Sequence, residues 1–329
     1  MKEIKLGTIG SGVIVHSILD QVKRIPGVKL VAVYSRTQEK GAALAAEYGA
    51  QKVYTDMDAF LADPEVNVVY IATPNLLHYA QARKALLAGK HVILEKPFTT
   101  KVSDARELVR IAKEKHLLLV DAVPPAYLPN FQILKEQLAK IGRVKLVMSN
   151  YSQYSSRYDK VLAGEVPNIF NPELAGGSLM DINFYNVYLN IALFGKPQQA
   201  VYYPNIYPGL ADTSGVMVLR YADFVSQNAG AKDTWGVNFF QIEGEKGYIY
   251  AENGANRITA LRVVTKEGEE ILNAQPDPNC WYYEVQKVSQ EVLAEDYDSI
   301  YGRLDTMLDV IATMEESRKA AGIRFPGDE

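Results

Sequence analysis

The first 120 or so residues alternate between short apolar runs and amphipathic segments, and this alternation limits the fold more than any other feature. The amphipathic segments carry Ala, Leu, Lys and Glu at helical spacing, and Gly49 and Gly89 stand where glycines commonly end helices. Apolar strands separated by helices predict a parallel sheet covered on both faces. Because such crossovers are right-handed, we expect a doubly wound Rossmann sheet of the nucleotide-binding type. The expected strands contain residues 6–9, 30–34, 68–72, 91–94 and 117–120.

The pattern changes after about residue 121, where a proline-containing turn leads into one amphipathic segment over 130–141. Strand-like runs joined by short turns follow, which is typical of antiparallel hairpins, and a last helix is expected over about 299–321. The 329 residues therefore predict a dinucleotide-binding domain over 1–121 and an α+β domain with a large, mostly antiparallel sheet over 122–329. The expected strands of the second domain are 144–151, 199–207, 215–221, 224–229, 235–243, 248–251 and 258–264.

Composition and charge exclude several classes of function. The chain has 35 basic and 39 acidic residues and no basic block, which argues against a nucleic-acid or anionic-membrane surface. No apolar run reaches the ~18 residues of a membrane helix, and signal-peptide features are missing. The single cysteine, Cys280, cannot form an internal disulfide, so we expect a cytoplasmic protein. The four histidines lack metal-ligand spacing and no Gly-x-Ser-x-Gly elbow occurs, so we expect neither a metal site nor a serine hydrolase.

A glycine-containing turn, Gly10-Ser-Gly12, directly follows the first expected strand and precedes a helical segment. In a dinucleotide-binding fold the first glycine permits the tight turn, and the second lets the backbone approach the pyrophosphate at the helix N-terminus. Val15 occupies the third glycine position of the usual fingerprint. The place of the turn in a βαβ unit nevertheless favours nucleotide binding over an ordinary glycine turn, with Val13 and Ile14 as further contacts.

The end of the second expected strand predicts the cofactor. Sites that prefer NAD usually carry Asp or Glu there, to bind the ribose 2′-hydroxyl. Here Ser35 and Arg36 follow Tyr34, and a guanidinium can form charge-assisted hydrogen bonds to a 2′-phosphate. We therefore expect NADP to be preferred over NAD. The alternative is an exposed arginine without a role, which would allow either cofactor.

Two further segments carry a family resemblance. One is Ala-Thr-Pro-Asn-Leu-Leu-His at residues 72–78, with Glu-Lys-Pro at 95–97; the other is Ala-Gly-Gly-Ser-Leu-Met-Asp-Ile-Asn-Phe-Tyr at 175–185. With the glycine turn, these segments resemble the glucose–fructose oxidoreductase / inositol dehydrogenase / MocA family over essentially the whole chain. The resemblance implies a pyridine-nucleotide-dependent oxidoreductase of sugars, polyols or related hydroxylated rings. It also implies a homodimer or homotetramer formed through the outer face of the second domain's sheet.

The resemblance also implies the catalytic residues. Family members place the lysine that matches Lys96 beside the nicotinamide, often with a cis bond before the proline that matches Pro97. Asp181 and Tyr185 are four residues apart in a segment of helical periodicity, which puts them on one face. Most members carry histidine where this chain has Tyr185, whereas a branch resembling glucose–fructose oxidoreductase and the dihydrodiol dehydrogenases carries tyrosine.

The catalytic hypothesis assigns one role to each of these groups. Tyr185 exchanges the proton with the substrate oxygen, Lys96 holds that oxygen and lowers the pKa of the tyrosine, and Asp181 orients the lysine or the substrate. Whether Tyr185 or Lys96 donates the proton stays open at this point. Without the motif context, Tyr185 would be interpreted as a packed aromatic and Lys96 as a solvated loop lysine.

Supporting contacts come from the loops around these motifs. Asp121 stands where members of the family often carry glutamate, and Ala126, Ala175 and Asn183 depart from the family pattern, which puts the substrate in question. The expected cofactor contacts are Thr73, Asn75, His78, Glu95, Lys96 and Pro97. The expected substrate contacts are Arg157, Tyr158 and Asn168, for each of which a solvated loop is the alternative.

Two other function classes compete with the dehydrogenase. The same fold resembles a transcriptional repressor of sugar metabolism in yeasts, a non-catalytic nucleotide sensor, but the retained Lys96 disfavours that interpretation. Some relatives are glycosidases that use NAD transiently, and such an enzyme would show no net change in cofactor absorbance during turnover.

Overall fold

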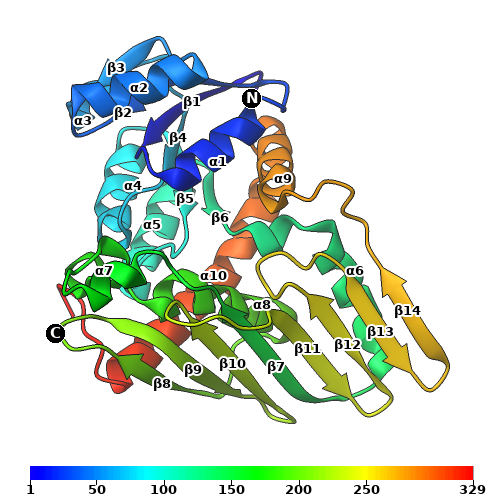
Figure 1. Cartoon of the computed structure of the whole chain (residues 1–329). Coiled ribbons are helices and arrows are strands. Elements are labelled where there is room, and N and C mark those ends of the chain that lie inside the picture. The colour runs from blue at the N-terminus through cyan, green and yellow to red at the C-terminus, as the bar shows by residue number, and fades with distance from the viewer. Residues whose placement is uncertain (329) are drawn as a thin grey trace. The chain divides into compact units, whose positions relative to one another are not determined.

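The computed structural model describes residues 1–328 and divides into two compact units (Figure 1). The first unit comprises Met1–Val123 and Trp281–Leu308, and the second comprises Pro124–Cys280 and the chain from Asp309 onward. The sequence prediction assigned everything after residue 121 to the second domain, whereas in the structure residues 281–308 belong to the first unit. No helix within residues 1–328 is both long and apolar enough to cross a membrane.

The first unit contains a six-stranded parallel sheet, which confirms the predicted doubly wound architecture. The strand order is β3-β2-β1-β4-β5-β6. From β1 the chain adds β2 and β3 on one side and then returns to add β4, β5 and β6 on the other side, as in dinucleotide-binding sheets. The strands are β1 (Ile4–Ile9), β2 (Val28–Tyr34), β3 (Lys52–Tyr54), β4 (Val68–Ile71), β5 (His91–Glu95) and β6 (Leu119–Ala122). The helices between them are α1 (Val13–Val22), α2 (Gln38–Tyr48), α3 (Met57–Ala62), α4 (His78–Leu87) and α5 (Val102–Glu114).

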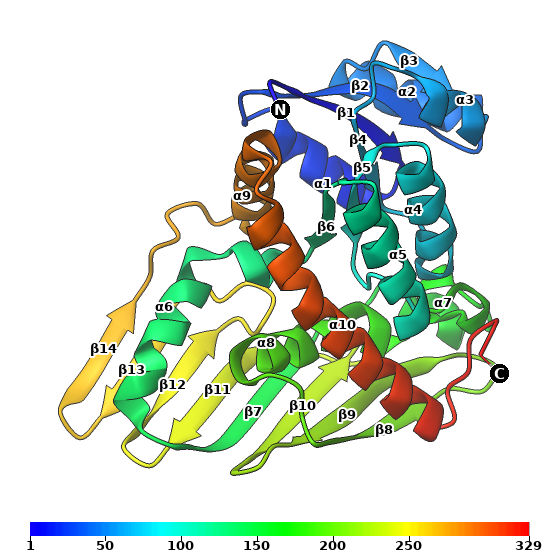
Figure 2. The same ribbon diagram turned by 180° about the vertical axis from the view of Figure 1, so that it is seen from behind.

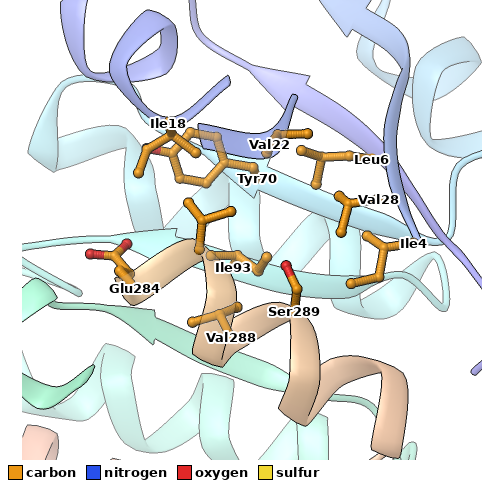
Figure 3. Close-up of a pocket in the computed structure, with 11 residues that line it drawn as sticks. Ile4, Leu6, Ile18, Val22, Val28, Tyr70, Ile93, Glu284, Val288 and Ser289 are labelled. Atoms are coloured by element: carbon orange, nitrogen blue, oxygen red, sulfur yellow. The ribbon is translucent and has the colours of Figure 1, made fainter. Parts of the chain in front are cut away.

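A helix that the sequence prediction did not include, α9 (Cys280–Ala294), packs on this sheet beside α1. A small apolar cavity separates the two helices from β1, β4 and β5, and Figure 3 shows Val288 of α9 facing Ile93 across it. The hydroxyl of Tyr301, in the first half of α10 (Tyr297–Ala320), donates a 2.8 Å hydrogen bond to the Leu117 carbonyl. These contacts explain why residues 281–308 join the first unit.

The second unit is built on an eight-stranded sheet in the order β14-β13-β12-β11-β7-β10-β9-β8. Only the β7–β10 pair is parallel, so the prediction of a mostly antiparallel sheet is confirmed. Helices α6 (Pro129–Gln137) and α8 (Phe184–Phe194) cover one face of it (Figure 2), and α7 (Tyr158–Leu162) is a short helix in a loop. The strands are β7 (Val144–Ser152), β8 (Gln199–Ile206), β9 (Asp212–Arg220), β10 (Val225–Ala231), β11 (Phe239–Gly244), β12 (Gly247–Glu252), β13 (Leu261–Thr265) and β14 (Gly268–Leu272).

Two predicted strands of the second unit begin three or four residues later than expected. The strand predicted over 235–243 begins at Phe239, and Trp235 and Val237 are exposed in the preceding loop. The strand predicted over 258–264 begins at Leu261, because Ile258 has a φ of 45° and its amide donates to the Gly254 carbonyl in a turn. A prediction from apolar side chains alone therefore made both strands too long at their start.

Buried asparagines attach α8 to the sheet. Asn183, Asn186 and Asn190 lie on one face of the helical segment and are fully buried. The Asn183 side chain donates to the Asn228 carbonyl of β10 at 3.1 Å, and that of Asn190 donates to Oδ1 of Asn228 at 2.7 Å. Ser149 of β7 donates to the same oxygen at 2.8 Å. These hydrogen bonds are directional and buried, so together they fix both the position and the rotation of α8.

A π-helical turn, Leu179–Asn183, directly precedes α8, and its first residue is bound by Asp212 of β9. The Asp212 carboxylate accepts hydrogen bonds of 2.6 Å from the Leu179 amide and from the Tyr202 hydroxyl. A Cβ on Gly177 would stand 2.2 Å from Asp212 Oδ1, so this position requires glycine. Burial raises the pKa of Asp212 from its ordinary 3.8 to about 6.

This raised pKa predicts a pH-dependent stability. The proton binds more tightly to Asp212 in the folded state than in the unfolded state, so its contribution to stability is present at low pH and is lost as the pH rises through about 6. In Asp212→Asn this dependence is gone. The difference between the free energies of unfolding of the wild type and the variant should therefore shift by about 2 kcal/mol in favour of the wild type as the pH falls from about 7 to about 4. Urea unfolding across this range measures it, and parallel pH curves for the two proteins would contradict it.

Candidate functional site

The turn between β1 and α1 has the shape of a phosphate-binding turn. Gly10 has a φ of 121°, and a Cβ there would lie 2.3 Å from the Ala72 carbonyl oxygen at the end of β4, so only glycine fits. Open space surrounds the position where a Cβ on Gly12 would stand. The helix begins at Val13, which is 75% exposed, and its first turn carries no acidic side chain. The first amides of a helix lack intrahelical acceptors, so those of Val13 and Ile14 suit an anion.

The end of β2 presents the two residues predicted to select the cofactor. Ser35 is buried, and its amide donates to the Tyr54 carbonyl of β3 at 3.0 Å. Arg36 is exposed, and within residues 1–328 it forms no ion pair. Arg36 thus follows the carboxyl end of β2, the place where the ribose of a dinucleotide binds in such folds.

His78 ties together the two loops that follow β4 and β5. Its ring nitrogens face the carbonyl oxygens of Thr73 and Pro97, each at 2.9 Å, and the residue is 1% exposed. Burial lowers the pKa of His78. The Thr73 hydroxyl donates to Gln81 at 2.6 Å, and Asn75 begins the short helix Asn75–Leu77. His78 thus lies between the backbones of both predicted cofactor loops, and its neutral ring donates its single N–H to one of the two carbonyls at a time. The Lys96–Pro97 peptide bond is cis, as the family resemblance predicted.

Glu95 points into the first unit. Its carboxylate accepts a 2.7 Å hydrogen bond from the Tyr70 hydroxyl and a 3.2 Å hydrogen bond from the Lys96 amide, which fixes the backbone at the lysine. Asp121, at the end of the neighbouring strand β6, lies 3.5 Å from the guanidinium of Arg303. Burial, and then the negative charges of Glu95 and Asp121, raise the pKa of Glu284, whose carboxyl appears in Figure 3.

Asp181 and Tyr185 belong to the second unit and share the partly exposed side of their helical segment, since the three residues between them are buried. Asp181 lies in the π-helical turn and Tyr185 in the first turn of α8. The Tyr185 ring packs on Tyr151 of β7, with ring centres 5.9 Å apart. The asparagine network on the opposite side therefore determines which way both side chains point.

The predicted substrate residues lie between positions 157 and 168, in the chain that precedes the same segment. Tyr158 begins α7 and packs edge-on against Phe170, with ring centres 6.1 Å apart. Arg157 and Asn168 are exposed, and Asn168 begins a short helix that ends at Phe170. The Gly177 amide donates to the Ile169 carbonyl at 2.8 Å, so this loop lies directly against the glycines before Asp181.

Sequence reasoning missed Lys232, which follows β10 and is 5% exposed. Its ammonium group donates a hydrogen bond to Oδ2 of Asp181 and forms an ion pair with it. The two residues are 51 positions apart, and no spacing pattern connects them. Among the described residues, no group of three or more His, Cys, Asp or Glu side chains is arranged to hold a metal ion.

Asn183, a departure from the family pattern, has a structural explanation. The residue is buried in the network with Asn228 and faces the sheet, away from the side of the helix that carries Asp181. A Cβ on Gly230 of β10 would lie 2.5 Å from the Asn183 Cβ, so a glycine at this position of the strand leaves room for the asparagine.

Comparison with known proteins agrees with this architecture. Residues 4–122 match the model of an oxidoreductase family with an NAD-binding Rossmann fold, and residues 131–250 match the GFO/IDH/MocA C-terminal domain. The chain is 33% identical over 327 residues to scyllo-inositol 2-dehydrogenase (NADP(+)) IolU of Bacillus subtilis, covering 99% of each chain. It is 26% identical to trans-1,2-dihydrobenzene-1,2-diol dehydrogenase of Sus scrofa, again covering 99% of each.

Solved structures share the fold. KijD10, a 3-ketoreductase from Actinomadura kijaniata in complex with NADP and TDP-benzene, superposes with a TM-score of 0.85 at 20% identity, covering 96% of this chain and 97% of that one. Biliverdin reductase from Synechocystis gives a TM-score of 0.79 at 20% identity. With both family models matched and a relative of 33% identity over almost the full length, the chain belongs to the Gfo/Idh/MocA family of oxidoreductases.

Proposed function

We propose that this protein is an NADP-dependent oxidoreductase that transfers a hydride between the nicotinamide and a hydroxyl-bearing carbon of a sugar, polyol or cyclic diol. The observation that carries the proposal is a β1–α1 turn shaped for a dinucleotide phosphate, in a chain 33% identical to an NADP-dependent inositol dehydrogenase. Relatives named as acting on dihydrodiols and on D-xylose widen the substrate class beyond inositols.

The residues of the first unit fit the cofactor. The amides of Val13 and Ile14, reached across Gly10 and Gly12, would bind the pyrophosphate. Ser35 and Arg36 would bind the 2′-phosphate, which favours NADP over NAD while leaving NAD usable. The loops that His78 ties together, with Thr73, Asn75, Glu95, Lys96 and Pro97, would contact the rest of the molecule. When bound, the nicotinamide accepts the hydride during oxidation or supplies it during reduction.

The chain itself must position the alcohol and move one proton. Oxidation of CH–OH to C=O releases a hydride from carbon and a proton from oxygen, and Tyr185 accepts that proton and passes it to solvent. Lys96 holds the substrate oxygen, and its positive charge favours the deprotonated phenol. Asp181 accepts a hydrogen bond from the substrate or from the lysine and so orients it. The reverse reaction uses the same groups, with Tyr185 as the proton donor.

A substrate panel tests the function. The purified protein should reduce NADP in the presence of at least one inositol, aldose, polyol or trans-dihydrodiol, followed as absorbance of the reduced cofactor, with a higher kcat/KM for NADP than for NAD. Turnover of a glycoside without net cofactor reduction would identify a glycosidase instead. Nucleotide binding with no turnover across the whole panel would identify a sensor.

The same assay tests the role of Arg36. In Arg36→Ala, the kcat/KM with NADP should fall by about ten- to a hundredfold, because charge-assisted hydrogen bonds to the 2′-phosphate are lost. The kcat/KM with NAD should stay unchanged, since NAD carries no phosphate there. An equal loss with both cofactors would contradict the assignment.

Substitution of the catalytic groups should lower kcat. Tyr185→Phe and Lys96→Ala should each lower it by about 10²- to 10⁴-fold, the usual contribution of a positioned proton-transfer group. Tyr203→Phe, at an exposed tyrosine of β8, is the matched control and should keep wild-type kcat. Near wild-type turnover in Lys96→Ala would refute the scheme, and a larger loss in Lys96→Ala than in Tyr185→Phe would make the lysine the proton donor.

We also propose that the protein is cytoplasmic and forms a homodimer or homotetramer through the outer face of its eight-stranded sheet. Tyr203 is 64% exposed, and Phe239 and Tyr250 stack on that face with ring centres 6.0 Å apart. Exposed aromatic side chains on one sheet face are typical of protein interfaces. Light scattering should give two or four times the mass of one chain, and Tyr250→Arg should lower it; a monomeric wild type would refute the assembly.

A further inference from the structure

On the basis of the proposed function, we infer that Lys232 is a positioning residue of the active site. Its ammonium group holds the Asp181 carboxylate ionised and in one orientation, so that Asp181 acts as a hydrogen-bond acceptor during the reaction. The lysine side chain is 6% exposed and that of Asp181 is 28% exposed. The ion pair therefore has a buried end at the sheet and an accessible end on the helix.

The backbone of Lys232 is held on both sides. Its amide donates to the Thr213 carbonyl of β9 at 2.9 Å, and its carbonyl accepts from the Ser155 amide at 2.9 Å. The carboxylate of the neighbouring Asp233 is bound elsewhere, because its Oδ2 accepts hydrogen bonds from the hydroxyls of Thr213 at 2.7 Å and Ser214 at 2.9 Å. A buried ammonium group needs a partner of opposite charge, and Asp181 supplies it.

The position of Asp181 is determined separately from that of Lys232. Its amide donates to the Gly177 carbonyl at 3.1 Å, and the start of its turn is bound to Asp212. The ion pair thus joins two independently anchored segments, the loop after β10 and the turn before α8. A charged pair between fixed backbones restricts the carboxylate to one rotamer, which is what a group that orients a substrate requires.

The chemical consequence concerns protonation. A cation at hydrogen-bond distance favours the charged form of a carboxyl group, and a carboxylate has about four lone-pair sites, so bonding to Lys232 leaves it able to accept from another donor. The titratable groups on the elements that pack against this turn are Tyr151 and Lys145 of β7, Tyr185 and Tyr188 of α8, Asp212 and Arg220 of β9, and Asp233 after β10. Lys145 and Arg220 lie beside the first residue of β10, at the opposite end of that strand from Lys232. Lys232 contacts Asp181 directly, so its positive charge stabilises the ionised carboxylate.

The test compares Lys232→Met, which removes the charge at similar length, with Lys232→Arg, which keeps it. Lys266→Met, in an exposed turn, is the control. In Lys232→Met, the acid limb of the pH profile of kcat/KM should move upward by about one to three pH units, because Asp181 loses its cation. Lys232→Arg should restore the limb toward its wild-type position, and Lys266→Met should leave it unchanged. An unmoved limb in Lys232→Met would overturn the inference.

A second measurement does not depend on turnover. Urea unfolding of Lys232→Met, Asp181→Asn and the double variant at neutral pH forms a double-mutant cycle. Non-additive losses show that the two side chains interact in solution, whereas additive losses overturn the ion pair. If no substrate is turned over by the wild type, the proposed function fails while this cycle still decides whether Lys232 holds Asp181.

Discussion

The buried amide network between α8 and the sheet is the interaction on which the second unit's candidate site depends. Asn183, Asn186 and Asn190 direct their side chains into the interior, where Asn228 of β10 receives two of them. An apolar helix face can slide or rotate at small cost, but a buried amide that loses its partner loses a full hydrogen bond. The network therefore gives the helix one position, and the opposite side of that helix carries Asp181 and Tyr185.

Other close contacts refine that position. The turn before α8 is bound to Asp212, and Gly177 allows the two segments to approach. Lys232 then reaches the turn from the end of β10 and pairs with Asp181. In the first unit a comparable close approach, between Gly10 and the Ala72 carbonyl, shapes the turn proposed to bind the cofactor phosphates. In both units, glycines stand where a Cβ would collide with a neighbouring segment.

Much of the fold was predictable from the sequence because its signals are local. Strands buried on both faces are almost wholly apolar, so the runs around β1, β2, β4, β5 and β6 stood out between helical segments. The same signal fails where apolar residues lie outside strands. Trp235 is 79% exposed in a loop, and Ile258 adopts a positive φ in a turn, yet both had been interpreted as parts of strands. Helix α9 was missed. It packs on the N-terminal sheet although it lies more than 150 residues after that sheet in the chain, so no local pattern connects the two.

The sequence by itself determined the fold class, the family and the positions of Gly10, Lys96, Asp181 and Tyr185 in motifs, because each of these is a pattern of neighbouring residues. Only the tertiary structure decided that Asn183 faces the sheet and that Lys232 binds Asp181. These partners lie 45 and 51 residues apart, and their contacts exist only once β10 has paired with β7 and β9 and α8 has packed on that sheet. Periodicity and motif spacing report local geometry, whereas a buried hydrogen bond or ion pair between distant segments is a property of the packed chain.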